Sequence, residues 1–214
     1  MNLHHINIAM HVLAGSSALI VGLVALIATK GKKTHRLMGR IFLYLIALVI
    51  LTGLIGVFVF ARNTFLLVIT VLVGYEAFSG FRILKTKSNK VKLIDVMVAF
   101  IALISVTYFL YYFKSIGMIW SLVIIYSTVG YLVLLIVYDL IRYLIPARLY
   151  ANLWLYEHIL KMVSALTGLF SAFSGTVFPQ YQPYSQFIPS ILGTLVAVMF
   201  MVTVRPKKFQ GIAK

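Results

Sequence analysis

Cysteine is absent from this chain of 214 residues, and acidic residues are scarce, with four Asp and Glu against 19 Lys and Arg. A chain without cysteine forms no disulfide, no thiolate metal site and no cysteine nucleophile. The sequence also lacks the GxSxG and HExxH motifs, so nothing in it predicts a serine hydrolase or a zinc hydrolase. Proline is rare as well, and we expect none in the interior of a membrane span, unlike the broken helices of many transporters.

Apolar sequence is abundant instead. Hydrophobic residues make up 62% of the chain, and its mean hydropathy is +1.03. Segments of about 20 apolar residues are typical of membrane-spanning helices. The sequence predicts an all-α integral membrane bundle of seven transmembrane helices, formed by residues 1–214 as a single domain. The expected spans lie at about 6–28, 36–60, 64–84, 93–113, 117–141, 149–173 and 186–204.

Basic residues gather in every second gap between these spans. Because cytoplasmic loops collect Lys and Arg, this pattern predicts an outside N-terminus and a cytoplasmic C-terminus in the cell (inner) membrane. The net charge of +15 then favours contact with anionic lipid headgroups at the cytoplasmic face rather than with nucleic acid. The basic clusters are Lys30, Lys32, Lys33, Arg36 and Arg40, then Arg82, Lys85, Lys87, Lys90 and Lys92, then Arg142 and Arg148, and finally Arg205, Lys207, Lys208 and Lys214.

Small and polar residues recur at three- and four-residue spacing in the first, second and sixth spans. Such stripes predict the faces through which membrane helices pack, because lipid provides no hydrophobic drive for helix contact. In the first span the stripe contains His11, which we therefore expect to point into the bundle. The stripes are His4, Asn7, His11, Gly15, Ala18, Gly22 and Thr29, then His35, Gly39, Phe42, Ile46, Val49, Gly53 and Gly56, then Glu157, Lys161, Ser164, Gly168, Ser171 and Gly175.

Ionisable residues inside a bilayer are expensive and predict a functional site. The helical rise places several polar residues of four different spans about 12–18 Å from the cytoplasmic side, and His11 about 25 Å from it. We therefore predict a buried polar site, with His11 as a further ligand candidate nearer the outer side and with no metal. The expected members of the site are Tyr44, Glu76, Tyr131, Glu157, His158 and Lys161. Asp95 and Asp139 fall at cytoplasmic helix ends, where we expect them to balance Lys92 and Arg142.

A structural role for the same residues has to be weighed against this prediction. Glu157 and Lys161 are four residues apart on one helix, so they can neutralise each other. His158 and the tyrosine hydroxyls would then be interhelical hydrogen-bond partners. Glu76 has no such partner on its own helix. A carboxyl group buried alone favours its protonated form, which suits proton transfer.

Three functions remain open at this point, and the sequence does not decide whether the protein is an enzyme. The first is binding of a small hydrophobic or redox ligand, quinone-like or haem-like, with linked proton handling. Haem held by two histidines needs both imidazoles at one depth, which no pair among His11, His35 and His158 satisfies, although His11 with Met162 would be an alternative. The second function is proton-coupled transport of a small molecule. The third is a non-catalytic membrane subunit or scaffold.

The N-terminal third carries the residues His11-x-x-x-Gly15, Gly22, Lys30-Gly31 and His35-Arg36-x-x-Gly39, with weaker support from Trp154, His158 and Met162. In these residues the chain resembles an uncharacterised family of bacterial multi-pass membrane proteins, a domain of unknown function. The resemblance covers about the first two spans. It implies a bacterial membrane protein with inward-facing histidines, and it implies no particular reaction.

Overall fold

The structure is a computed structural model, and it describes residues 2–60, 66–117 and 121–204. All secondary structure in these residues is helical, and seven helices are long and apolar enough to cross a membrane, which confirms the predicted number of spans. The helices are α1 (Leu3–Ile27), α2 (Lys33–Phe58), α3 (Leu66–Thr86), α4 (Leu93–Ile116), α5 (Leu122–Ile141), α6 (Ala147–Val177) and α7 (Tyr184–Thr203). Short 3-10 turns, η1 (Arg142–Leu144) and η2 (Pro179–Tyr181), precede α6 and α7.

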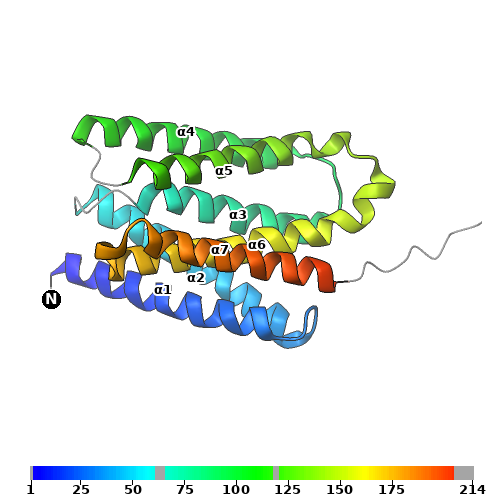
Figure 1. Cartoon of the computed structure of the whole chain (residues 1–214), viewed down its shortest axis with the longest axis horizontal. Helices are drawn as coiled ribbons and strands as arrows, with labels where there is room; N and C mark the ends of the chain where they lie inside the picture. Colours follow the sequence, from blue (N-terminus) through cyan, green and yellow to red (C-terminus); the bar gives the residue numbers. More distant parts are fainter. Residues whose placement is uncertain (1, 61–65, 118–120, 205–214) are drawn as a thin grey trace, which may run out of the picture.

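Helix α3 lies in the middle of the bundle, with α4 and α5 on one side and α1, α2, α6 and α7 on the other (Figure 1). It packs against α2, α4, α5 and α6, and most of its residues are buried. Helix α1 packs chiefly against α2, and α7 packs against α6. A polar side chain on the inner faces of α3 or α6 is therefore shielded from lipid by neighbouring helices.

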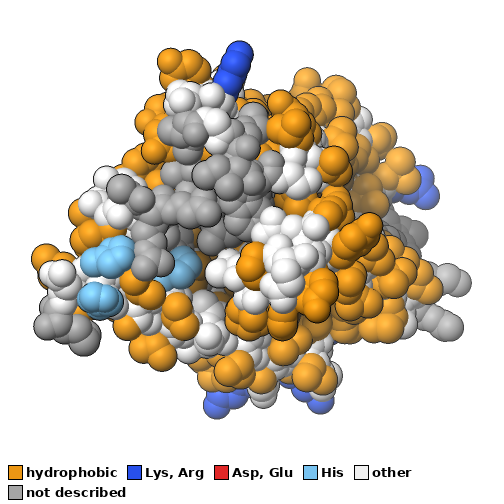
Figure 2. Space-filling model, turned by 60° about the vertical axis from the view of Figure 1, so that its left-hand side comes forward, with side chains coloured by type: hydrophobic (Ala, Val, Ile, Leu, Met, Phe, Trp, Pro, Cys, Tyr) orange, Lys and Arg blue, Asp and Glu red, His pale blue; other side chains and the backbone are white. Residues whose placement is uncertain are grey.

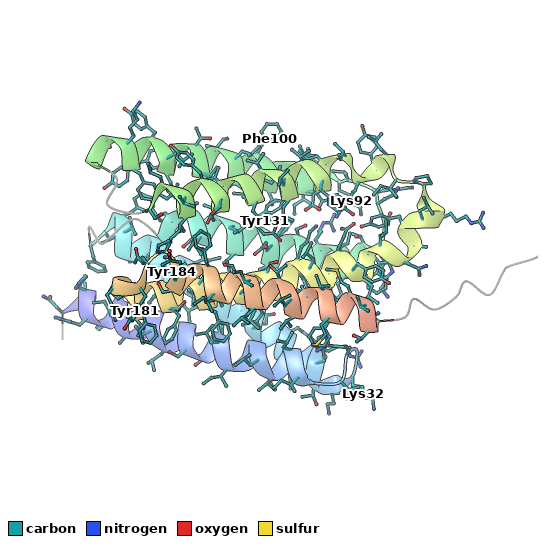
Figure 3. All side chains as sticks on the ribbon, viewed as in Figure 1. Lys32, Lys92, Phe100, Tyr131, Tyr181 and Tyr184 are labelled. Atoms are coloured by element: carbon teal, nitrogen blue, oxygen red, sulfur yellow. The ribbon has the colours of Figure 1, made fainter. Side chains whose placement is uncertain are left out.

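The two ends of the bundle differ in charge. The α1–α2, α3–α4 and α5–α6 connections and the end of α7 lie together at one end, here called the basic end, where Figure 3 places Lys32 and Lys92. The N-terminus and the α6–α7 connection, with Tyr181 and Tyr184, lie at the opposite end. Figure 2 shows this opposite end covered mainly by hydrophobic side chains, with histidines among them and Lys or Arg only at the edge. The predicted gathering of the basic loops at one end is thus confirmed, whereas the basic tail of residues 205–214 lies outside the described residues.

Small residues let the helices approach closely. The buried residues of α1 are Ala14, Ala18, Gly22 and Ala25, all on one face. At Gly22 an added Cβ would come within 2.6 Å of Leu166 in α6 and 2.9 Å of Phe42 in α2, so a larger residue would force these side chains to move. The predicted packing face of α1 is confirmed, and the larger apolar side chains of this helix, such as Leu13 and Ile20, are exposed on its outer side.

The expectation that no proline lies inside a span was wrong. Pro189 is within α7, where it has no N–H to donate to the carbonyl of Ser185 one turn earlier. The Ser174 hydroxyl of α6 donates to this carbonyl instead, at 2.5 Å. A neighbouring helix thus satisfies the freed backbone group, which is how membrane helices accommodate proline.

Candidate functional site

Four buried charged side chains form a closed ring of ion pairs on the inner side of α5 and α6, toward the basic end. Arg142 contacts Asp139 at 3.5 Å and Glu157 at 3.2 Å. Lys161 contacts Glu157 at 3.6 Å and also pairs with Asp139. Acids and bases therefore alternate around the ring, and no member exposes more than 7% of its side chain. We call these four residues the ion-pair ring.

Hydroxyl groups occupy the remaining acceptor positions of the two carboxylates. Tyr75 and Ser79 of α3 both donate to Oδ2 of Asp139, at 2.9 Å and 2.5 Å. Tyr138 donates to Oε1 of Glu157 at 2.5 Å. The Lys161 ammonium in turn donates to the Ser79 hydroxyl at 2.8 Å. The ring is thus hydrogen-bonded to α3, which compensates part of the cost of removing its charges from water.

The central residue of α3, Glu76, lies just outside this ring. Its side chain is completely buried, and neither carboxyl oxygen makes a hydrogen bond to the described residues. Its polar neighbours are the Lys161 ammonium and the hydroxyls of Tyr131 and Ser164, which hydrogen-bond to each other at 3.1 Å. The Lys161 charge is already shared by Asp139 and Glu157. Glu76 therefore has no cation of its own.

The balance of charges around Glu76 indicates whether its carboxyl group is protonated. The ion-pair ring holds two acids and two bases and is neutral by itself. An ionised Glu76 would leave one uncompensated negative charge in the bundle interior, at a cost of several kcal/mol for an ion without a partner. Binding a proton removes this cost. The geometry therefore favours a neutral, protonated Glu76 beside a charged but balanced ring.

The structure brings most of the predicted site residues together, but not all of them. Glu157 and Lys161 are in the ring, while Glu76 and Tyr131 are beside it. His158 faces another way, because its Nδ1 bonds to the carbonyl of Gly80 in α3 at 2.9 Å. The predicted burial of Tyr44 was wrong, since 76% of this residue is exposed. Its position on α2 faces outward, because Phe42 and Ile46 form the buried face of that helix.

Asp139 and Arg142 were not predicted as members of the site. The expected pairing of Asp139 with Arg142 is confirmed at 3.5 Å, but a position at the end of a helix suggested a place near water, whereas both side chains are buried. Glu157 and Lys161 of α6 reach these two residues, and Tyr75 and Ser79 of α3 also contact Asp139. The scarcity of acids was the available signal, since a chain with four carboxylates rarely leaves one without a specific role. Asp95 was expected to balance Lys92, but its ion pair is with Arg82 at 2.7 Å, and from Lys92 it accepts the backbone N–H, at 2.8 Å.

His11 lies apart from this cluster, nearer the opposite end. It points into the bundle as predicted, and its Nδ1 lies 2.9 Å from the hydroxyl of Thr52 in α2. Asn7, one turn earlier, donates to the Thr52 backbone carbonyl at 3.1 Å. These bonds join α1 to α2, so the position of His11 is explained by helix packing.

The histidines of the described segments do not converge on a haem or metal position. The Nδ1 atoms of His11, His35 and His158 are each hydrogen-bonded to a different partner, namely Thr52, Ala25 and Gly80. No group of three or more His, Asp or Glu side chains in the described part of the chain could hold a metal ion. Met162, the alternative haem ligand, lies against Gly80, whereas His11 lies against Gly53. Neither two of the histidines His11, His35 and His158 nor His11 with Met162 therefore provide a pair of axial ligands for the predicted haem-like group.

Comparison of the chain with protein-family models, curated proteins and solved structures found no match. The resemblance of the N-terminal third to an uncharacterised bacterial family therefore stays a prediction. The structural findings define a multi-pass membrane protein with a buried polar site, built from seven apolar helices.

Proposed function

We propose that this protein is a proton-coupled membrane transporter of a small molecule, in which Glu76 binds and releases the coupling proton. One observation carries the proposal. Glu76 is completely buried at the middle of the central helix, and its carboxyl group has neither an ion pair nor a hydrogen bond among the described residues. An intramembrane carboxyl group of this kind is typical of proton relays in pumps and transporters.

The ion-pair ring supports this role, because the contacts within it depend on whether Glu76 is protonated. With Glu76 protonated the core is neutral, and when the proton leaves, the Lys161 ammonium is the nearest cation that can turn toward the new carboxylate. Such a shift would weaken the pairs that Lys161 makes with Asp139 and Glu157. Since the Lys161–Asp139 pair links α6 to α5, loss of the proton would change how these two helices are held together.

Binding of a quinone-like ligand is the second candidate function. The hydroxyls of Tyr131 and Ser164 lie beside Glu76 and could hydrogen-bond to a carbonyl group. A carboxyl group next to them could supply the proton that quinone reduction consumes. This candidate shares the protonatable Glu76 with the transporter and differs from it in the ligand.

For orientation, we propose that the basic end faces the cytoplasm and contacts anionic headgroups of the cell membrane. The support is the gathering of the basic loops at one end, as the positive-inside rule requires. The natural absence of cysteine makes a test direct. With a membrane-impermeant maleimide added to intact cells, we expect labelling of His5→Cys and none of Lys32→Cys. The reverse pattern would overturn the orientation.

Infrared spectroscopy of the purified protein tests the function, because a protonated carboxyl group has a C=O band distinct from that of a carboxylate. We expect such a band at neutral pH, and we expect Glu76→Gln to abolish it while Glu157→Asp leaves it in place. In vesicles containing a pH-sensitive dye, addition of a small-molecule cell extract should change the internal pH with the wild-type protein and not with Glu76→Gln. A missing band would overturn the role of Glu76. A band without any pH change, together with bound quinone in the purified protein, would favour the second candidate.

A further inference from the structure

A small cavity lies beside the ion-pair ring at the basic end of the bundle. Its volume is about 10 Å³, which is close to the space that one water molecule needs. The residues that line it are Tyr75, Phe78, Ser79, Asp95, Asp139, Leu140 and Arg142. Three of them are charged, so the cavity is polar although it adjoins membrane-spanning helices.

The guanidinium group of Arg142 indicates that the cavity is hydrated. Arg142 Nε is buried and makes no hydrogen bond to the described residues. A buried N–H group without an acceptor is costly, and a bound water with several polar partners removes that cost. Asp139 and the hydroxyls of Tyr75 and Ser79 line the same space and provide such partners.

The outer wall of the cavity reaches the end of the bundle. Asp95 is in the first turn of α4, and its side chain is partly exposed, as is that of its ion-pair partner Arg82, which lies 2.7 Å away. The start of α4 lies at the basic end of the bundle, next to the α3–α4 connection. The cavity therefore lies between the basic end and the ion-pair ring.

Exchangeable protons continue inward from the cavity toward Glu76. Ser79 lines the cavity, donates to Asp139 at 2.5 Å and accepts from Lys161 at 2.8 Å. Lys161 is the cation next to Glu76. The contacts of Ser79 with Asp139 and Lys161 are hydrogen bonds, whereas the last step requires the Lys161 side chain to turn toward Glu76, because neither Glu76 oxygen is hydrogen-bonded to the described residues.

On the side away from the ring, beyond the hydroxyls of Tyr131 and Ser164, the core around Glu76 is mainly apolar. Helix α3 starts at the opposite end, and between that end and Glu76 it places Leu67, Val68, Leu72 and Val73, each at most 9% exposed. Ala165 and Leu169 of α6 are buried in the same core. Apolar packing of this kind slows proton movement, because it holds no water and few hydrogen-bonding groups.

We propose that protons reach Glu76 from the basic end, through a water bound in the cavity between Asp95 and Arg142 and then through Ser79 and Lys161. This inference rests on the proposed protonation of Glu76. It adds the direction of proton entry and a water-binding site.

Hydrogen–deuterium exchange of the Glu76 carboxyl group tests this route. The protein is transferred into D₂O, and the shift of the Glu76 C=O infrared band is followed with time. Because the natural chain has no cysteine, Ser79→Cys introduces a single thiol into the cavity, and methyl methanethiosulfonate then adds a methylthio group that fills it. We expect this modification to slow exchange of the Glu76 carboxyl about tenfold or more, since it displaces the water.

Thr52→Cys is the matched control, because Thr52 is a buried hydroxyl residue near the opposite end. Its modification should leave the exchange rate within about twofold of the unmodified variant, since the route does not pass it. Phe78→Trp provides a second way to fill the cavity without changing a polar group. Slowing in modified Ser79→Cys or in Phe78→Trp supports the route.

Several results would overturn the route: a thiol in Ser79→Cys that does not react, unchanged exchange in both cavity-filling variants, or slowing only in modified Thr52→Cys. Failure of the proposed function gives a different result. In that case no protonated Glu76 band is present in the wild-type protein, whatever the reactivity of the thiol at position 79.

Discussion

Arg142 and Glu157 form an ion pair of 3.2 Å across the short connection between α5 and α6. Arg142 follows the last turn of α5, and Glu157 is in the third turn of α6. The pair closes the ion-pair ring, because each partner also contacts a second ring member, Asp139 or Lys161. It therefore sets the position of the long helix α6 against the end of α5.

Removal of Arg142 should destabilise the protein more than removal of the whole pair. Arg142→Met leaves the ring with an unbalanced negative charge, and we expect a loss of about 3–5 kcal/mol. The double variant Arg142→Met/Glu157→Gln keeps the core neutral, with Asp139 and Lys161 still paired. It should therefore recover part of the loss. Thermal unfolding in detergent measures both variants, and a double variant less stable than Arg142→Met would contradict the charge-balance argument.

The protonation state of Glu76 should depend on the ring. Glu157→Gln leaves two bases and one acid, so one positive charge is uncompensated. We expect Glu76 to lose its proton in this variant and to pair with Lys161, because the carboxylate then balances the excess charge. The measurement is the infrared band of the protonated carboxyl group, which should decrease at neutral pH. The band should persist in Glu157→Asp, which keeps the charge.

Close packing of α1 against α2 and α6 depends on Gly22. Gly22→Val should cost about 1–3 kcal/mol, since the added atoms meet Leu166 and Phe42 in a filled core. Gly130→Val is the matched control, because an added Cβ at Gly130 meets nothing within 4 Å. Thermal unfolding of the two variants should separate them clearly. Equal losses would mean that Gly22 is not at a tight helix contact.

The proline in α7 should make Ser174 important for stability. Ser174→Ala leaves the Ser185 carbonyl without its donor, and we expect a loss of about 1 kcal/mol. Pro189→Ala restores a backbone N–H one turn after Ser185. The loss from Ser174→Ala should therefore be smaller in a Pro189→Ala background. A double-mutant cycle measured by thermal unfolding checks this coupling, and strict additivity of the two effects would argue against it.

Periodicity and charge placement were sufficient to predict the spans and the packing faces. The number of helices follows from the length of each apolar segment, and the inward direction of His11 follows from the spacing of small residues around it. Glu157 and Lys161 could be expected to pair, because they are four residues apart on one helix. All of these features depend on residues close together in the chain.

The residues that were wrongly placed depended on contacts between distant segments. Tyr44 was assigned to the site by depth alone, but depth does not give the direction of a side chain around its helix. Asp139 is near the end of α5, and it is buried among partners from other segments, namely Tyr75 and Ser79 of α3 and Lys161 of α6. Pro189 is tolerated because a serine of another helix lies beside it.

The sequence by itself determined that this protein has seven helices long and apolar enough to cross a membrane, that its basic loops share one end, and that Glu76 lacks a partner on its own helix. These are properties of local composition and spacing. Only the tertiary structure decided that Asp139, Arg142, Glu157 and Lys161 neutralise one another and leave Glu76 without a cation. The physical reason is that ion pairing depends on distances of a few ångströms between side chains, and packing of α3, α5 and α6 sets those distances.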